Sequence, residues 1–294
     1  MAGVQTEMAL CFRPWMGSHR IFGRLGCNSL MADWWSDRTP LHDAAFQGRL
    51  LNLRTLLSQG YSVDTLTMDR VSPLHEACLG GHYACVKFLL ESGANVEAVT
   101  ADGATPLSSA CSSGSAACVR LILQYSPVLL FSHQLASPIH EAARKGHSEC
   151  VEVLLTHGAH IDLQLPGQGT PLYSACLARS AECVERLLYL GADVQLGCGP
   201  DSPLHVAVRE GGVRVVELLM DYGADGSCRN ADRKTPLDLA AANSPVRTTL
   251  LSRGPCSLAQ ACRVSIRRSL GGSRLHGASG LFLPLRLQAF LLYQ

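Results

Sequence analysis

A short motif recurs seven times along the chain at nearly constant spacing. Each copy is a threonine or serine followed by proline and then leucine or isoleucine, and successive prolines lie 32 or 33 residues apart. The prolines are Pro40, Pro73, Pro106, Pro138, Pro171, Pro203 and Pro236. Such self-similarity predicts a stack of like units, because one small unit cannot bury its apolar face alone.

Residues 72–95 illustrate the local structure that each unit should adopt. Ser72 is a good helix N-cap, and Pro73 stands at the first helical position, where a missing N–H costs nothing. Gly80 interrupts the first apolar run, a second run has helical periodicity, and Gly93 follows it as a C-terminal cap. The pattern predicts two short helices packed back to back.

The seven copies resemble ankyrin repeats, whose signature Thr-Pro-Leu-His-x-Ala recurs every 33 residues. The resemblance covers residues 32–253 and implies an all-α solenoid of about seven repeats with β-hairpin fingers between them. We expect residues 1–31 to be a flexible leader; the alternative is a strap lying on a partner or on the first repeat. Trp34 and Trp35 should cover the exposed end of the stack, unless they anchor a partner.

Three repeats depart from the pattern. In the third, Gln124-Tyr125-Ser126-Pro127 replaces the expected Gly-Ala, which predicts a different helix end and a different finger at 128–135. In the fifth, Arg179 replaces a glycine that its neighbours share. The seventh degenerates at residues 243–246, as a closing repeat often does.

After Gly254 the composition changes, and residues 257–266 read as an amphipathic helix. Ser257 and Gln260 have capping-box spacing, and Arg267 lies near the C-terminus, where a cation suits the helix dipole. One face combines apolar and small residues, namely Leu258, Ala261, Cys262, Ser265 and Ile266. No residue of the repeat pattern is left over to cover this face, so it needs a partner.

This segment fits the Ser/Thr-Leu-x-x-x-Cys-x-x-x-aliphatic pattern of an Elongin-binding box, and Leu283-Pro284 resembles the start of a cullin-selecting half. The whole chain therefore resembles the ankyrin repeat and SOCS box family, with the SOCS box at residues 254–294. The resemblance implies Elongin contacts at Ser257, Leu258, Cys262 and Ile266, and cullin contacts at Leu283 and Pro284. Two departures are Ala261, where the family usually has leucine, and Arg286, where a second proline is common.

The function implied is that of a non-catalytic substrate receptor in a cullin–RING ubiquitin ligase. Its partners would be Elongin B/C, a cullin of the fifth class with its RING subunit, and an unidentified target protein that is ubiquitinated and degraded. The alternative is an ankyrin scaffold or inhibitor whose C-terminal helices only cap the stack. An enzyme has no supporting motif, because no Walker loop or nucleophile elbow occurs in the sequence.

In ankyrin repeats the concave face is built from finger tips and first-helix ends, and we expect the target to bind there. These positions vary between copies while the motif does not, as expected where packing does not dictate the residue. The positions are Phe46, Gln47, Asp69, Arg70, Asp102, Arg144, Lys145, Arg209 and Glu210.

The histidines and cysteines repeat with the motif and indicate structural roles. His75 and His82 are seven apart, not four as in a zinc-protease helix, so the motif histidines should hydrogen-bond turn backbone. The cysteines, thirteen in all, should fill the core as reduced thiols without metal or other cofactor. The net charge of +1 and the absence of a signal peptide or long apolar run predict a cytoplasmic protein without nucleic-acid or membrane partners.

Overall fold

The computed structural model describes residues 38–126, 137–253, 258–270 and 284–292. The regular secondary structure of these residues is helical, and turns and loops connect the helices. Trp34, Trp35 and the finger at 128–135 lie outside these ranges. The first helix of every repeat begins at its motif proline: α1 (Pro40–Phe46), α3 (Pro73–Leu79), α5 (Pro106–Ser113), α7 (Pro138–Lys145), α9 (Pro171–Leu177), α11 (Pro203–Arg209) and α13 (Pro236–Leu239).

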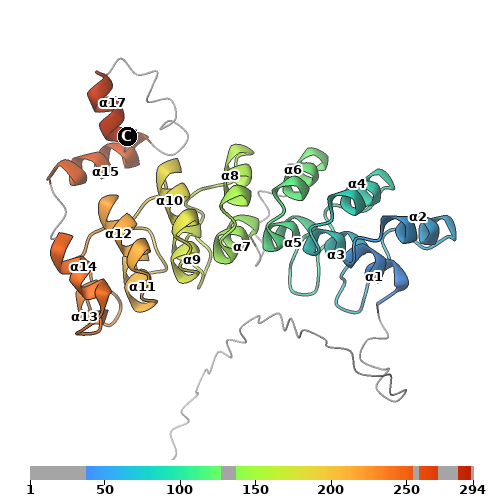
Figure 1. The fold of residues 1–294 in the computed structure, drawn as a ribbon, viewed down its shortest axis with the longest axis horizontal. Helices are drawn as coiled ribbons and strands as arrows, with labels where there is room; N and C mark the ends of the chain where they lie inside the picture. The colour runs from blue at the N-terminus through green and yellow to red at the C-terminus, as the bar shows by residue number, and fades with distance from the viewer. Residues whose placement is uncertain (1–37, 127–136, 254–257, 271–283, 293–294) are drawn as a thin grey trace, which may run out of the picture. The chain divides into compact units, whose positions relative to one another are not determined.

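The second helices are α2 (Leu50–Ser58), α4 (Tyr83–Glu91), α6 (Ala116–Tyr125), α8 (Ser148–Thr156), α10 (Ala181–Leu190), α12 (Val213–Asp221) and α14 (Pro245–Arg253). First helices pack on first helices and second helices on second helices, which gives two parallel rows (Figure 1). The chain continues through α15 (Leu258–Leu270) and α17 (Leu285–Leu292), which contact each other. The predicted ankyrin solenoid is confirmed.

A buried histidine joins each of four repeats to the next. The His75 Nδ1 accepts a hydrogen bond from the backbone N–H of Ser72, 3.2 Å away, so Nε2 carries the proton and donates to the carbonyl of Ala104, also at 3.2 Å. His42, His140 and His205 make the same bond, to Val71, Gly169 and Lys234. The predicted bonding to turn backbone is confirmed, and each acceptor belongs to the following finger.

The fingers themselves are tight turns. Thr67 N–H donates to Val71 and Thr100 N–H to Ala104, which closes the second and third fingers. In the described residues, β-pairing is limited to two isolated antiparallel bridges, Leu165↔Gly169 and Cys198↔Asp201.

The core is lined by the motif leucines and by small residues, many of them cysteines. Leu74, Leu107, Leu172 and Leu204 are fully buried. The buried cysteines are Cys78, Cys85, Cys111, Cys118, Cys150, Cys176 and Cys183. Burial raises the pKa of the Cys150 thiol to about 12 and that of Cys183 to about 11. Their predicted role as core filling is confirmed.

Close packing across successive repeats explains where glycine is needed and where it is not. Gly48 has φ +69°, and a Cβ there would lie 2.6 Å from the His82 ring of the next repeat. Gly114 faces His147 at the same distance. Arg179 also has a positive φ, +53°, but the residue opposite it in the next repeat is Gly212, which has no side chain where His82 and His147 face Gly48 and Gly114. The arginine is therefore accommodated by a glycine one repeat further on.

The two other predicted departures are also visible. α6 ends at Tyr125 with Ser126 in an extended conformation, and the Ser126 hydroxyl donates to the Glu97 carboxylate at 3.1 Å. In repeat seven, α13 has only four residues before Ala240 leaves the helical conformation.

We expect substitutions at Gly48 and Arg179 to change stability in opposite directions. Gly48→Ala should lower the free energy of unfolding by about 1 kcal/mol for the left-handed backbone alone, and further because the His82 ring must move. Arg179→Gly should leave it unchanged or raise it by up to about 1 kcal/mol. Urea unfolding of both variants tests this expectation, and a marked loss in Arg179→Gly would contradict it.

Acid should weaken the stack through His75, whose pKa burial lowers from 6.5 to about 4. The folded state holds this histidine neutral, so the unfolded chain binds more protons between these values. The stabilisation is therefore complete above pH 6.5 and is lost as the pH falls towards 4. His75→Gln should reduce the slope of unfolding free energy against pH in this window by up to about 1.4 kcal/mol per pH unit. An unchanged slope would show that His75 does not titrate in this way.

Candidate functional site

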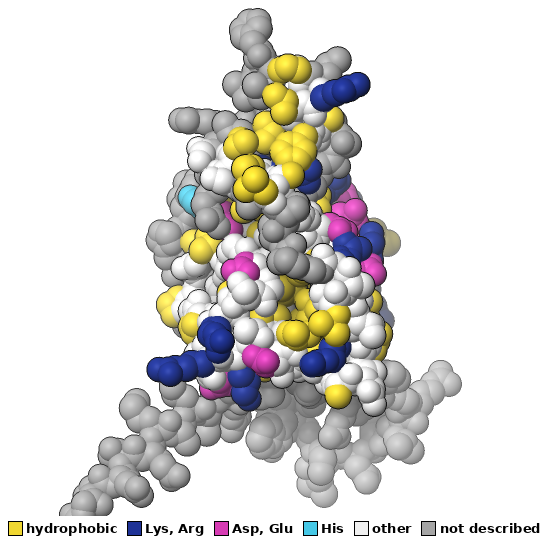
Figure 2. Space-filling view, turned by 90° about the vertical axis from the view of Figure 1, so that its left-hand side faces the viewer, with side chains coloured by type: hydrophobic (Ala, Val, Ile, Leu, Met, Phe, Trp, Pro, Cys, Tyr) yellow, Lys and Arg dark blue, Asp and Glu magenta, His cyan; other side chains and the backbone are white. Residues whose placement is uncertain are grey.

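Helix α15 turns its apolar stripe outwards. Leu258, Cys262 and Ile266 are spaced by four residues, and all three side chains are exposed, Leu258 to 81%. In the space-filling view, hydrophobic side chains lie at the surface of the C-terminal helices (Figure 2). We call these three residues the outward stripe. A helix that packed on the ankyrin stack only as a cap would bury such a stripe.

The opposite face of α15 is largely polar and is the half-buried one. It carries Gln260, Arg263, Val264 and Arg267. The Gln260 amide donates to the carbonyl of Met220 in α12 at 3.4 Å, and the Arg267 guanidinium donates to the carbonyl of Leu188 in α10 at 2.7 Å. Gln260 and Arg267 therefore attach this helix to the ankyrin repeats, while the side chains of the outward stripe are exposed on the other face.

Helix α17 packs on α15 through its C-terminal half. Arg263 of α15 stands over the Phe290 ring at 3.9 Å, and Leu291 is buried. The carbonyl of Pro284 accepts hydrogen bonds from the N–H groups of Leu287 and Gln288, so the first turn of α17 begins at this proline. Pro284 itself is exposed.

Two of the predicted SOCS-box residues, Ser257 and Leu283, lie outside the described residues. The capping box expected between Ser257 and Gln260 therefore remains a prediction, and the structure shows the Gln260 amide at α12 instead. Leu258, Cys262 and Ile266 share one face as predicted.

The residues predicted to bind a target form a row along the repeats instead of one pocket. Phe46 and Gln47 end α1, Arg144 and Lys145 end α7, and Arg209 with Glu210 ends α11. Arg144 pairs with Glu141 at 2.5 Å, and Arg209 pairs with Asp201 at 3.3 Å. We call this row, together with the finger tips, the finger face.

The predicted finger residues lie next to one another. Asp69, Arg70 and Asp102 are all exposed, and the carbonyl of Asp69 accepts a hydrogen bond from the N–H of Ala101 at 2.9 Å. Adjacent fingers are thus linked at their tips, which brings Asp69 near Asp102. Repeats four and six contribute their residues further along the row.

The prediction missed two groups on the finger face. Arg38 forms a 2.7 Å ion pair with the buried Glu76 and lies 5.5 Å from the centre of the Phe46 ring. Burial raises the pKa of Glu76, and the Arg38 charge opposes this shift. Leu79 and Leu177 are exposed to about the same extent as Phe46, at the same position of their repeats. That shared position, six residues after the motif proline, was the signal available in the sequence.

The described residues contain no group of three or more histidine, cysteine, aspartate or glutamate side chains placed to hold a metal ion. None of the helices in the described ranges is both long and apolar enough to cross a bilayer.

Comparisons with known families match nearly the whole described chain. Ankyrin-repeat families match residues 41–130, 128–198 and 190–240, and the SOCS box family matches residues 254–292. A zebrafish (Danio rerio) relative, ankyrin repeat and SOCS box protein 11, is 54% identical over 293 residues and covers 100% of both chains. The chain belongs to the ankyrin repeat and SOCS box family.

Other relatives support the same family assignment. Mouse ankyrin repeat and SOCS box protein 9 is 57% identical over 267 residues, covering 90% of this chain and 92% of that one. The crystal structure of the human ASB11 ankyrin repeat domain superposes with a TM-score of 0.72 at 54% identity, covering 75% of this chain and 100% of the other. The ankyrin repeat domain of Bcl-3, an IκB family member, superposes with a TM-score of 0.60 at 31% identity, covering 74% of this chain and 99% of the other. Family membership implies, in general terms, a substrate-adaptor role in cullin–RING ubiquitin ligases.

Proposed function

We propose that this chain is the target-recognition subunit of an Elongin B/C–cullin–RING ubiquitin ligase. The observation that supports this most directly is the outward stripe, an apolar row on a helix whose polar face is the one attached to the repeats. Leu258, Cys262 and Ile266 match the Elongin-binding pattern position by position. In the proposed complex Leu258 fills a pocket of Elongin C, Cys262 packs at its rim, and Ser257 caps the helix.

The physical contribution of such a subunit is effective concentration. Tethering the target beside a ubiquitin-charged enzyme turns a bimolecular encounter into a local one, without any reacting group on the receptor. The cullin contact is assigned to Leu283 and Pro284 at the start of α17, and a cullin of the fifth class is proposed for it. The proposal places the complex in the cytoplasm.

The target is proposed to bind the finger face. It combines apolar side chains, Phe46, Leu79 and Leu177, with charged ones further along the repeats, such as Lys145 and Arg209. A surface of this kind suits a protein segment better than a small molecule, because the groups are spread along a row and do not converge.

The second candidate function is an ankyrin scaffold or inhibitor whose C-terminal helices only complete the stack. The contacts of Gln260 and Arg267 with α12 and α10 are compatible with it. It does not account for the exposure of Leu258, since a helix serving only as a cap has no reason to turn its apolar residues towards solvent.

A double change, Leu258→Ala with Cys262→Ala, should abolish most of the affinity for purified Elongin B/C. Truncating a leucine that becomes buried costs roughly 2–5 kcal/mol, which is well over tenfold in the dissociation constant. The unfolding midpoint of the free chain should not change, because Leu258 is already exposed there. Calorimetry or co-purification measures the binding.

The matched control is Leu251→Ala, which removes an exposed leucine of α14 outside the outward stripe and should bind Elongin normally. Full Elongin binding by the double variant would contradict the receptor assignment and favour the scaffold. Equal losses in the double variant and the control would mean that the stripe is not the contact.

Lys145→Glu on the finger face should weaken target capture and leave Elongin binding intact. Lys145 is preferred to Arg144, because reversing Arg144 would also break its ion pair and place a second carboxylate beside Glu141. Proximity labelling in cells, with the proteasome blocked, compares the wild type with Lys145→Glu and the Leu258/Cys262 variant. A target is a protein lost from the first variant and retained by the second. Identical labelling in wild type and Lys145→Glu would move the target site away from this residue.

A further inference from the structure

Arg267 binds the ends of two helices that belong to different parts of the chain. Its guanidinium donates to the carbonyls of Leu188 and Tyr189 at the end of α10, at 2.7 and 3.3 Å. It also donates to the carbonyl of Leu291 at the end of α17, at 2.7 Å. One side chain therefore contacts both an ankyrin repeat and the second SOCS-box helix.

These acceptors are the groups that most favour a cation. The last four carbonyls of a helix have no partner within the helix, and the aligned peptide dipoles place partial negative charge there. Arginine offers five donors in a fixed planar fork, so it can bind several carbonyls in one geometry. Hydrogen bonds from a charged donor are also stronger than neutral ones.

Gln260 provides a second contact of the same kind, seven residues earlier on α15. Its amide donates to the carbonyl of Met220, in the last turn of α12. Seven residues of helix span about 10.5 Å, close to the 8–10 Å between packed helices. The two side chains can therefore reach the ends of two successive second-row helices at the same time, which sets both the position and the direction of α15 across them.

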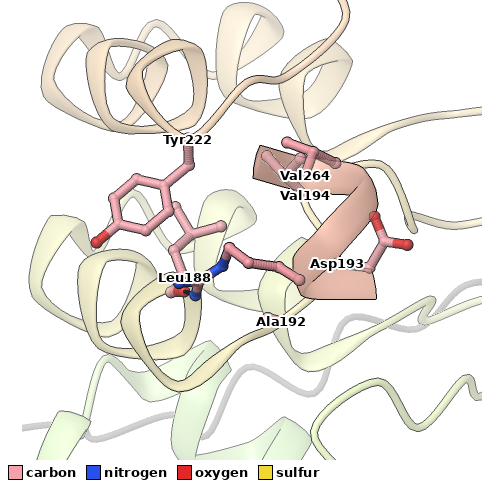
Figure 3. Close-up of a pocket in the computed structure, with 7 residues that line it drawn as sticks. Leu188, Ala192, Asp193, Val194, Tyr222 and Val264 are labelled. Carbon is pink, nitrogen blue, oxygen red and sulfur yellow. Dashed lines mark hydrogen bonds between the residues drawn. The ribbon is translucent and has the colours of Figure 1, made fainter. Parts of the chain in front are cut away.

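The space beside Arg267 is closely filled. A cavity of only about 30 Å³ lies at this joint, lined by Leu188, Ala192, Asp193, Val194, Tyr222, Val264 and Arg267. The labelled side chains come from the end of α10 and the loop after it, from the residue after α12 and from α15 (Figure 3). The Arg267 guanidinium lies 6.0 Å from the Tyr222 ring centre. Val264 of α15 and residues of the repeats thus line the same small cavity beside Arg267.

We propose that Arg267 is a positioning residue that fixes the orientation of the SOCS-box helices relative to the ankyrin repeats. The consequence for ubiquitin transfer rests on the proposed function: the repeats would hold the target, α15 would hold Elongin, and this joint would set which target lysines the ligase reaches. The outward stripe plays no part in the joint, so orientation and Elongin binding are separable.

The test compares Arg267→Gln with Arg286→Gln, which removes the same charge from an exposed position on α17. Nitroxide labels on non-natural amino acids at the exposed positions Glu149 of α8 and Ala259 of α15 avoid the thirteen cysteines. Pulsed electron paramagnetic resonance on the free full-length chain should give one narrow distance distribution for the wild type and the control. Arg267→Gln should give a broad one, and Arg267→Lys, which keeps the charge without the fork, an intermediate width.

Hydrogen exchange gives a second measure of the same joint. An undocked α15 of thirteen residues is too short to be stable alone, so its amides should exchange about tenfold faster in Arg267→Gln. A broad wild-type distribution would overturn the proposal, as would equal distributions in wild type and Arg267→Gln.

Binding of purified Elongin B/C separates this proposal from the proposed function. Arg267→Gln should bind Elongin within about twofold of wild type, since the outward stripe is unchanged. Parallel loss of Elongin binding would show that Arg267 acts by folding the box, which overturns a positioning role. If the wild type fails to bind Elongin B/C while Arg267→Gln broadens the distribution of label-to-label distances, the positioning role of Arg267 is supported and the proposed receptor function is contradicted.

Discussion

The hydrogen bond from a buried histidine to the backbone of the next finger joins four of the seven repeats to their successors. His75 illustrates it: one ring nitrogen accepts from the helix N-cap of its own repeat, and the other donates to Ala104 in the following repeat. In His75, accepting at one ring nitrogen while donating from the other requires a neutral ring with a defined tautomer, and burial lowers its pKa and so favours that state. Each of these four repeats is thus tied to its successor, in keeping with the nearest-neighbour contacts that stabilise such a stack.

The same dependence on neighbours explains the chain's C-terminus. The last carbonyls of second-row helices accept no intrahelical bond and can take further donors beside their cap N–H groups, and α15 supplies such donors to two helix ends through Gln260 and Arg267. The hydrogen bonds of this attachment come from polar side chains, and the outward stripe lies on the other face, with Leu258 its most exposed residue. One helix therefore has two functions on opposite faces: attachment to the repeats and, in our proposal, capture of Elongin.

The helices and the core of the ankyrin repeats were largely predictable from the sequence, because the repeat period fixes local structure independently of the rest of the chain. The motif prolines start every first helix, and the small residues that recur with them fill the core. The contacts between repeats were not predictable. In the sequence Arg179 replaces a glycine that its neighbours share, and only the structure places Gly212 opposite it. Arg267 suits the dipole of its own helix by position, whereas in the structure it binds the ends of α10 and α17. Such pairings depend on residues far apart in sequence, and no local pattern encodes them. The roles assigned to the finger face and the outward stripe remain predictions.

The central claim is that the outward stripe exists to be covered by Elongin, and hydrogen exchange measured with and without purified Elongin B/C tests it most directly. Binding should slow exchange throughout residues 258–270 and leave the amides of α1 to α9 unchanged, because the contact is confined to the SOCS box. Absence of protection in α15 under saturating Elongin B/C, or protection that falls on the repeats instead, would contradict the account.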